Sequence, residues 1–197
     1  MGDFMIEKSL VLIKPDAVAR GIVGEILHRF ERAGLKIVGM KLVTVTRDLG
    51  LKHYNHSTEW KIKVGNRNIE ECKQLGIDVF ECFGTTDAQE IGEQVDQRNA
   101  DFLSKSPVIA IVFEGPHAVK KIRSLVGSTF PDTALPGTIR GDFGADSAYS
   151  GMIRKRSTYN MIHASGEVDE AEAEIKLWFK KDEILNYKRV HEEFYLY

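Results

Sequence analysis

The stretch Ser9-Leu10-Val11-Leu12-Ile13 is an unbroken apolar run after its first residue. Such a run is typical of a central strand buried on both faces of its sheet, although a run this short is ambiguous by periodicity alone. Pro15 follows and cannot donate to a ladder, so we expect the strand to end there. Lys14 would then be a cation at the end of a buried strand, or an ordinary lysine reaching solvent.

Further strands and helices can be placed on either side of this stretch. Pro107–Phe113 is a second continuous apolar run, Leu35–Val45 is rich in β-branched and apolar residues, and Tyr159–Ala164 is short and apolar. Apolar residues at helical spacing predict four helices. These are expected from Ile22 to a cap at Gly34, over Leu49–Glu59 with Asp48 as N-cap, from Val119 to a cap at Gly127, and from about Asp169 through Phe179.

The order of these elements predicts the fold class. With the second and the last helix left aside, the order is β-α-β-β-α-β. This is the ferredoxin-like arrangement, an α/β fold of the α+β class. The 197 residues are enough for one domain, so we expect a single domain over 1–197. The residues at about 61–94 have a weak pattern punctuated by glycines, and we interpret them as an insertion too short for its own core.

Composition excludes several functional classes. The net charge of −2 gives no overall attraction to nucleic acids or membranes, so a polyanion would need a local cluster of cations. Cys72 and Cys82 form no CxxC pair, which favours free thiols in a reducing compartment. There is no signal-peptide pattern and no apolar run near the ~20 residues that span a bilayer, so we expect a cytoplasmic protein. The aromatic tail residues are expected to pack on the domain or on a partner: Tyr187, Phe194, Tyr195 and Tyr197.

The segment Asn160–Ser165, Asn-Met-Ile-His-Ala-Ser, contains the candidate nucleophile His163. A histidine can accept a phosphoryl or acyl group covalently, although most histidines are packed or surface residues. Glu174, at the margin of the apolar stripe of the last helix, could orient this imidazole or could be an ordinary surface residue. His53 and His56 could bind a metal at i and i+3, but no third ligand is nearby, so solvated side chains are the simpler interpretation.

Candidate site residues are distributed over the whole chain. Three cations, several hydrogen-bond donors, a nucleophile and an orienting carboxylate suit phosphoryl transfer, in which catalysis is mostly positioning and charge neutralisation. The long segment Ser128–Thr158, which supplies part of this set, is typical of a functional or a disordered loop. The candidates are Lys14, Tyr54, Arg123, Thr129, Arg140, Asn160, His163 and Glu174.

At these residues the chain resembles the nucleoside diphosphate kinases. The resemblance runs from about Glu7 to Tyr187, apart from two insertions, one at about 61–94 and the other a lengthened loop at about 144–158. The matching motifs are Ile13-Lys14-Pro15-Asp16, Arg20-Gly21 with Gly24-Glu25-Ile26, Pro136-Gly137-Thr138-Ile139-Arg140-Gly141-Asp142-Phe143, Asn160-Met161-Ile162-His163-Ala164-Ser165 and Glu174-Ile175-Lys176-Leu177-Trp178-Phe179.

The resemblance implies a ping-pong kinase in which His163 takes the γ-phosphoryl group of a nucleoside triphosphate and passes it to a nucleoside diphosphate. Glu174 would bind the second ring nitrogen of His163, Ser165 would support that carboxylate, and Tyr54 would support the site beside the phosphohistidine. The phosphates would be held by Lys14, Arg123, Thr129 and Arg140, and Asn160 would contact the sugar and phosphate end of the nucleotide.

The resemblance also implies a cofactor and an assembly. Mg²⁺ would be bound mainly through the nucleotide phosphates, so no protein ligand is assigned to it. The family forms hexamers or tetramers, so we expect a homo-oligomer. The family's Pro-Phe-Phe motif is absent, and the base could stack on Val95, Trp60 or Phe83, or on no aromatic residue. The family's Ser-Asp-Ser after the histidine is here Ser165-Gly166-Glu167.

Two other functional classes compete with this interpretation. A ferredoxin-like nucleic-acid-binding module could use Arg154-Lys155-Arg156, but no RNP-type aromatic motif is present and the chain is slightly acidic, so a nucleic-acid partner is not expected. A catalytically silent relative that acts in assembly or regulation is favoured only by the altered base platform. The sequence contains no GxxxxGK[ST], which argues against a Walker-type kinase.

Overall fold

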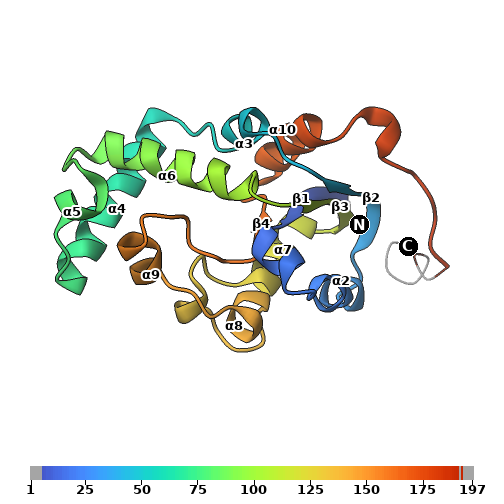
Figure 1. Cartoon of the computed structure of the whole chain (residues 1–197). Coiled ribbons are helices and arrows are strands. Elements are labelled where there is room, and N and C mark those ends of the chain that lie inside the picture. The colour runs from blue at the N-terminus through green and yellow to red at the C-terminus, as the bar shows by residue number, and fades with distance from the viewer. Residues whose placement is uncertain (1–5, 191, 193–197) are drawn as a thin grey trace.

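The computed structural model describes residues 6–190 and 192. Four strands form one sheet, and helices cover both of its faces (Figure 1). The elements in chain order are β1 Ile6–Ile13, α1 Pro15–Ala19, α2 Val23–Arg32, β2 Lys36–Val43, α3 Arg47–His53, α4 Thr58–Leu75, α5 Val79–Phe83, α6 Ala88–Leu103, β3 Val108–Pro116, α7 Ala118–Val126, the 3-10 turn η1 Pro131–Thr133, α8 Ile139–Phe143, α9 Ala148–Ile153, β4 Ile162–Ala164, α10 Val168–Trp178 and the 3-10 turn η2 Lys181–Glu183.

The sheet has the strand order β2-β3-β1-β4, and every neighbouring pair is antiparallel. This order and the alternation of strands and helices confirm the predicted ferredoxin-like α+β fold. β1 lies between β3 and β4, with Leu12 opposite both Ala110 and His163. The apolar run Ser9–Ile13 therefore belongs to a central strand.

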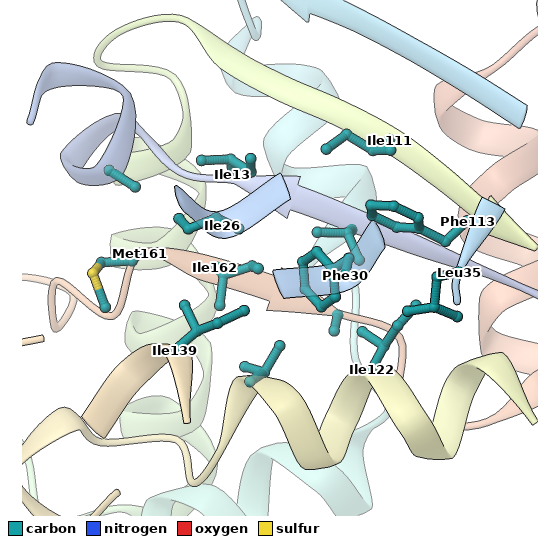
Figure 2. Packing of buried hydrophobic residues seen from close by; sticks show 14 of the residues in the cluster. Ile13, Ile26, Phe30, Leu35, Ile111, Phe113, Ile122, Ile139, Met161 and Ile162 are labelled. Carbon is teal, nitrogen blue, oxygen red and sulfur yellow. The ribbon is translucent and has the colours of Figure 1, made fainter. Parts of the chain in front are cut away.

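The apolar run in β1 has a simple explanation, because the sheet separates two hydrophobic cores. Successive side chains of a strand point to opposite faces. Val11 and Ile13 pack with α2 and α7, whereas Leu10 and Leu12 pack with α3, α6 and α10. Figure 2 shows the first of these cores, in which Phe30 and Phe113 approach to 4.9 Å between ring centroids.

The insertion is helical, which the sequence did not reveal. It contains most of α4, all of α5 and the start of α6, and these helices extend beyond the end of the sheet (Figure 1). Gly65 and Gly92, which we interpreted as breaks in the pattern, lie where α4 and α6 pack closely. A Cβ on Gly65 would lie 1.8 Å from the carbonyl oxygen of Ala88, and one on Gly92 would lie 2.2 Å from that of Lys61. These glycines therefore permit close helix packing.

The predicted helix Leu49–Glu59 is wrong at both ends. The N-cap is Thr46, whose hydroxyl accepts a hydrogen bond from the Leu49 backbone, and the helix α3 ends at His53. A new helix, α4, then begins at Thr58, with Ser57 as its N-cap. Two separate N-caps explain the break, because each offers a side-chain oxygen to the free N–H groups of a new first turn.

The long segment 128–158 is ordered into short elements: η1, α8 and α9. Its last part is held by the carboxylate of Asp146, which contacts Arg156 at 2.6 Å and accepts a hydrogen bond from the Tyr159 backbone at 2.7 Å. Met152 of α9 packs on the insertion, with its sulfur 3.7 Å from that of Cys72. The lengthened loop and the insertion therefore pack against each other.

The remaining segments add two observations. Tyr187 donates a hydrogen bond from its hydroxyl to the Ile37 carbonyl at 2.7 Å, so this part of the tail lies along β2. Phe194, Tyr195 and Tyr197, which we expected to pack on the domain or on a partner, are outside the described residues. Across 6–190 and 192, no helix combines the length and the apolar composition needed to cross a bilayer.

Candidate active site

His163 occupies the middle of β4, the shortest strand of the sheet. Its backbone pairs with that of Leu12, and directly opposite residues of an antiparallel pair point to the same face. The imidazole therefore lies on the Leu12 face, which is covered by α3 and α10. Ile162 and Ala164 point the other way, into the core with α2 and α7. The strand alternation thus places one polar side chain between two apolar anchors.

Glu174 on α10 contacts this imidazole directly. Its Oε1 lies 2.7 Å from Nε2 of His163, and its Oε2 accepts a hydrogen bond of 2.6 Å from the Ser165 hydroxyl. Ser165 is itself fully buried and accepts a hydrogen bond of 3.2 Å from the Leu10 backbone. Both carboxylate oxygens of Glu174 are therefore held by residues in or directly after β4. Of the two ring nitrogens of His163, only Nδ1 remains free to interact with a ligand in the pocket.

Lys14 lies at the end of β1, as expected, but it is buried. Its ammonium donates a hydrogen bond of 2.8 Å to Oδ1 of Asn160, whose Nδ2 in turn donates to the Thr129 carbonyl at 3.0 Å. Asn160 therefore links the end of β1 to the loop after α7. Its amide is largely engaged within the protein, with one N–H remaining for a ligand.

Arg140 of α8 is buried and uses most of its donors on backbone carbonyls. Nε binds Asn160 at 3.1 Å, Nη1 binds Gly127 and Ser128 at 3.2 and 2.9 Å, and Nη2 binds Ile162 at 2.6 Å. One guanidinium thus joins the turn after α7 to both ends of the Asn160–Ile162 segment. A guanidinium has five N–H groups, so Arg140 can offer a ligand its charge and one further donor.

Asp16 is a structural residue of the site to which the sequence analysis gave no role. Met161 has a left-handed backbone with φ of 63°, which is strained for a residue with a branched or long side chain. Its N–H donates to Oδ2 of Asp16 at 2.9 Å, and its carbonyl accepts from the Lys14 backbone at 2.8 Å. These two bonds hold the turn that aims Asn160 and His163 toward the same space.

His53 of α3 also belongs to the site, whereas the sequence favoured a solvated side chain over a metal ligand; that interpretation is wrong for His53, which is buried. Its buried ring lies edge-to-face on His163 with centroids 4.4 Å apart, and its Nδ1 accepts a hydrogen bond of 3.3 Å from Nε1 of Trp178. The same nitrogen is 3.5 Å from Oε1 of Glu174. The signal in the sequence was its place directly before Tyr54, which also reaches the site.

Burial and mutual charge set the protonation states. Burial lowers the pKa of His163, and the charge of Lys14 lowers it further, to about 3. Burial and the charge of Arg140 lower the pKa of Lys14 to about 7. Burial raises the pKa of Glu174, against the opposing effects of His53 and Ser165. Burial also raises the pKa of Tyr54, so its hydroxyl stays protonated near neutral pH.

The predicted residues meet at one pocket of about 620 Å³, a size typical of small-molecule sites. Glu174 and Ser165 lie behind His163, while the other seven predicted residues line the pocket: Lys14, Tyr54, Arg123, Thr129, Arg140, Asn160 and His163. Among the residues that the structure describes, Lys14, Arg123 and Arg140 have no carboxylate in salt-bridge contact. This end of the pocket is therefore suited to an anion.

The insertion and the residues next to it supply another part of the pocket lining. Val64, Arg67 and Asn68 of α4 line the pocket, as do all three residues considered for base stacking: Trp60, Phe83 and Val95. The indole of Trp60 is stacked on the His56 ring, with centroids 3.5 Å apart, so one of its faces is covered. His56 itself contacts Asp96 at 2.7 Å instead of a metal.

One cluster in the described part of the chain has the composition of a metal site: His53, His163 and Glu174. Two imidazoles and one carboxylate do not match Mg²⁺, which prefers oxygen ligands in octahedral geometry. The Glu174 and His163 ligand atoms are also within hydrogen-bond distance of each other, which leaves no room for an ion between them. The cluster is better described as a hydrogen-bonded group of side chains than as a metal site.

Comparison with known proteins finds a matching family model and similar sequences. The family model described as nucleoside diphosphate kinase matches residues 7–63 and 88–184, so it omits the centre of the insertion. A nucleoside diphosphate kinase of Pyrobaculum aerophilum is 42% identical over 180 residues, which cover 91% of this chain and 98% of that protein.

Two solved structures are also similar. An NDP kinase from P. aerophilum superposes with a TM-score of 0.90 at 40% identity, covering 92% of this chain and all of that one. A nucleoside-diphosphate kinase from Borrelia burgdorferi, a transition-state mimic with bound vanadate and ADP, has a TM-score of 0.76 at 38% identity, with 95% of each chain covered. The chain is therefore a phosphotransferase that belongs to the nucleoside diphosphate kinase family.

Proposed function

We propose that the protein transfers the γ-phosphoryl group of a nucleoside triphosphate to a nucleoside diphosphate in two half-reactions, with His163 as the phosphoryl carrier. The observation that supports this most directly is the contact of 2.7 Å between Glu174 Oε1 and His163 Nε2. An ionised Glu174 accepts a hydrogen bond from the Nε2–H group and so selects the tautomer whose lone pair is on Nδ1. The free lone pair makes Nδ1 the nucleophile.

In the first half-reaction, Nδ1 of His163 forms a bond to the γ-phosphorus while the bond from that phosphorus to the bridging oxygen breaks. The nucleoside diphosphate leaves with that electron pair, and the phosphohistidine remains. The second half-reaction reverses these steps with a different diphosphate. The pKa of about 3 keeps the imidazole neutral, and therefore nucleophilic, across the physiological range.

The cations supply the remaining catalysis. Charge on the three equatorial oxygens of the transferred group needs compensation, which preorganised donors provide without reorganising during the reaction. Lys14 and Tyr54, buried next to His163, would contact the transferred group. Arg123 and Thr129, exposed at the pocket, would hold the outer phosphates, and Arg140 would act mainly through its charge.

Magnesium would enter with the substrate. Mg²⁺ usually keeps several waters and binds substrate phosphates, with few protein ligands. The cation-rich end of the pocket suits a nucleotide whose phosphates already carry the metal. We therefore assign no residue of this chain as a magnesium ligand. When bound, the ion would neutralise charge on the phosphates.

Labelling with γ-labelled ATP tests the carrier role. We expect an acid-labile, base-stable phosphoprotein that transfers its label to nucleoside diphosphates, and no label on the His163→Ala variant. His28→Ala provides a matched control because His28 is exposed on α2. Equal labelling of the His163→Ala variant would remove this mechanism. No labelling of the wild-type chain would favour the catalytically silent alternative.

The nucleic-acid alternative has less support. Of the basic triplet Arg154-Lys155-Arg156, the last member is already paired with Asp146 at 2.6 Å and lies over the Tyr159 ring at 3.9 Å. A steep dependence of oligonucleotide affinity on salt would be its signature.

We also propose that the chain forms a homo-oligomer. β2 is an edge strand of the sheet and exposes Met40 and Leu42, of which 54% and 67% of the surface is accessible. The tail bonds to β2 at Ile37 and Val38, but the apolar side chains further along the strand stay exposed and are suited to association with a second copy. Sedimentation of the wild type and of Leu42→Glu tests this, because a charged residue at such an edge should favour the monomer.

A further inference from the structure

One face of α6 forms part of the wall of the pocket that is also lined by Lys14, Arg123 and Arg140. Val95, Arg98 and Asn99 follow the spacing i, i+3 and i+4, which places them on one helix face, and all three line the pocket. Gln97 lies between them in sequence and is exposed. The helix therefore presents one apolar and two polar side chains to a ligand.

The amide of Asn99 is oriented by its neighbour. The hydroxyl of Ser157 donates a hydrogen bond of 2.6 Å to Oδ1 of Asn99. Nδ2 of Asn99 has no acceptor within residues 6–190 and 192. The group that Asn99 has left to offer a ligand is therefore an N–H donor, since its oxygen is engaged by the hydroxyl.

Arg98 adds further donors. Its Nη2 donates to the Cys82 carbonyl at 3.1 Å and to Gln94 Oε1 at 3.3 Å, while the guanidinium lies over the Phe83 ring at 4.7 Å. For Nε and Nη1, the described part of the chain supplies no acceptor. Burial lowers the pKa of Arg98, and no carboxylate compensates this within the described chain. Its open N–H groups therefore favour an electron-rich partner.

The proposed function sets the direction in which a nucleotide lies, because its phosphates must reach His163. Of the other cations that line the pocket, Arg67 contacts Glu71 at 3.0 Å and Arg156 contacts Asp146 at 2.6 Å, whereas Arg98 and Lys63 have no carboxylate in salt-bridge contact among the described residues. Lys14, Arg123 and Arg140, at the His163 end, have no such carboxylate among the described residues. If phosphates occupy the His163 end, as the proposed function requires, the nucleobase is directed toward α6.

We propose that Arg98 and Asn99 contact the edge of the nucleobase and make this site prefer bases that carry a carbonyl group where others carry an amino group. At position 6 of a purine or position 4 of a pyrimidine, guanine, hypoxanthine and uracil present a carbonyl acceptor, whereas adenine and cytosine present an amino donor. Two donors meet a carbonyl favourably, but they leave an exocyclic amine without an acceptor.

Two substrate pairs isolate this difference. IDP and ADP differ at position 6 of the purine, and UDP and CDP differ at position 4 of the pyrimidine. The measurement is kcat/KM for discharge of the phosphorylated enzyme by each diphosphate. We expect IDP over ADP and UDP over CDP by about fivefold, the effect of roughly one hydrogen bond in a pocket open to water.

Variants of Asn99 test the assignment to this residue. Asn99→Leu removes the donor and should bring both ratios toward one. Asn99→Asp replaces the donor by an acceptor and should shift both ratios toward ADP and CDP. A change in kcat/KM that the new charge causes for all diphosphates alike cancels in a ratio of two kcat/KM values measured with the same variant. Gln97→Leu alters an exposed amide of the same helix and should keep the wild-type ratios.

Wild-type ratios near one, or ratios that are equal in wild type, Asn99→Leu and Asn99→Asp, would overturn the proposal. So would a preference for ADP over IDP that Asn99 variants leave unchanged, since it would point to another amide in the pocket, such as Asn68. Equilibrium affinities of IDP and ADP for His163→Ala should show the same preference. That readout needs no phosphohistidine, so failure of the carrier mechanism would be seen separately.

Discussion

Oε1 of Glu174 lies 2.7 Å from Nε2 of His163, although the two residues belong to different elements, α10 and β4. The Ser165 hydroxyl holds the other oxygen of the carboxylate at 2.6 Å. The ring therefore cannot rotate without breaking a buried hydrogen bond, and its two nitrogens are not equivalent. The packing of α10 on the sheet thus fixes the orientation of the His163 ring.

Glu174→Gln should slow phosphorylation of His163 by about 10². The neutral amide can donate to Nε2, which would select the tautomer that carries its proton on the attacking Nδ1. The nucleotide affinity should change little, because Glu174 lies behind the ring. Rapid-quench measurement of phosphoenzyme formation checks both expectations.

Glu172→Gln is the matched control for this substitution. Glu172 is exposed on the same helix and forms only a long contact of 3.8 Å with Lys176. Its phosphorylation rate should equal that of the wild type. A Glu174→Gln variant that is phosphorylated at the wild-type rate would show that the hydrogen bond does not control the reacting nitrogen.

The pH dependence of kcat/KM should report Lys14. Its pKa of about 7 in the free enzyme means that the ammonium loses its proton, and with it the charge that we propose binds phosphate, as pH rises through this value. The pKa of His163, about 3, leaves the imidazole neutral above that pH. We therefore expect kcat/KM to fall above about pH 7, whereas kcat should fall at higher pH, since bound phosphates raise the pKa of Lys14.

Lys14→Met should lower kcat/KM and abolish this alkaline limb, while Lys52→Met, which alters an exposed residue of α3, should retain it. The same alkaline limb in Lys14→Met would assign the titration to another group.

The fold could largely be predicted from the sequence, because the sheet repeats one simple signal. β1 and β3 are buried on both faces, so their apolar runs are continuous and easily recognised. The α4–α6 pair was missed because Gly65 and Gly92 resemble turn signals. Their actual role, close contact between two helices, depends on a partner that is distant in sequence and is invisible to local pattern reasoning.

The site, like the fold, could be predicted only in part from the sequence. Six of the nine predicted residues could be assigned from short motifs, namely Lys14, Arg140, Asn160, His163, Ser165 and Glu174, but the contacts of these side chains could not be predicted. Arg140 binds four backbone carbonyls, and His53 reaches His163 through the packing of α3 on the sheet. Such contacts follow from tertiary structure alone. Periodicity indicates which face of an element is buried, not which polar atoms meet there.

Gly92→Ala should destabilise the protein by about 2 kcal/mol or more, because the new methyl group would lie 2.2 Å from the Lys61 carbonyl oxygen and force α4 and α6 apart. Urea denaturation measures this loss. Gly24→Ala, on α2, meets nothing within 4 Å and should be neutral or stabilise by about 0.5 kcal/mol. Equal effects of the two substitutions would contradict close packing of the insertion.

Asp146→Asn should loosen the segment that joins α9 to β4. Burial alone would raise the pKa of Asp146, but hydrogen bonds, first from Arg156 and then from the Tyr159 backbone, hold it at about 2, below the ordinary value of 3.8. A carboxyl group whose pKa is lowered by folding stabilises the folded protein above its unfolded pKa. This contribution is lost as the pH falls through the folded pKa.

Asp146→Asn should therefore lower the free energy of unfolding by about 1–2 kcal/mol at pH 7, and the difference from wild type should shrink below about pH 4. Urea denaturation at several pH values measures this, and Asp48→Asn, which breaks an exposed pair with Lys52, should cost less than about 0.5 kcal/mol at every pH. A difference between Asp146→Asn and wild type that stays constant down to pH 3 would mean that the Arg156 contact does not depend on the charge of the carboxylate.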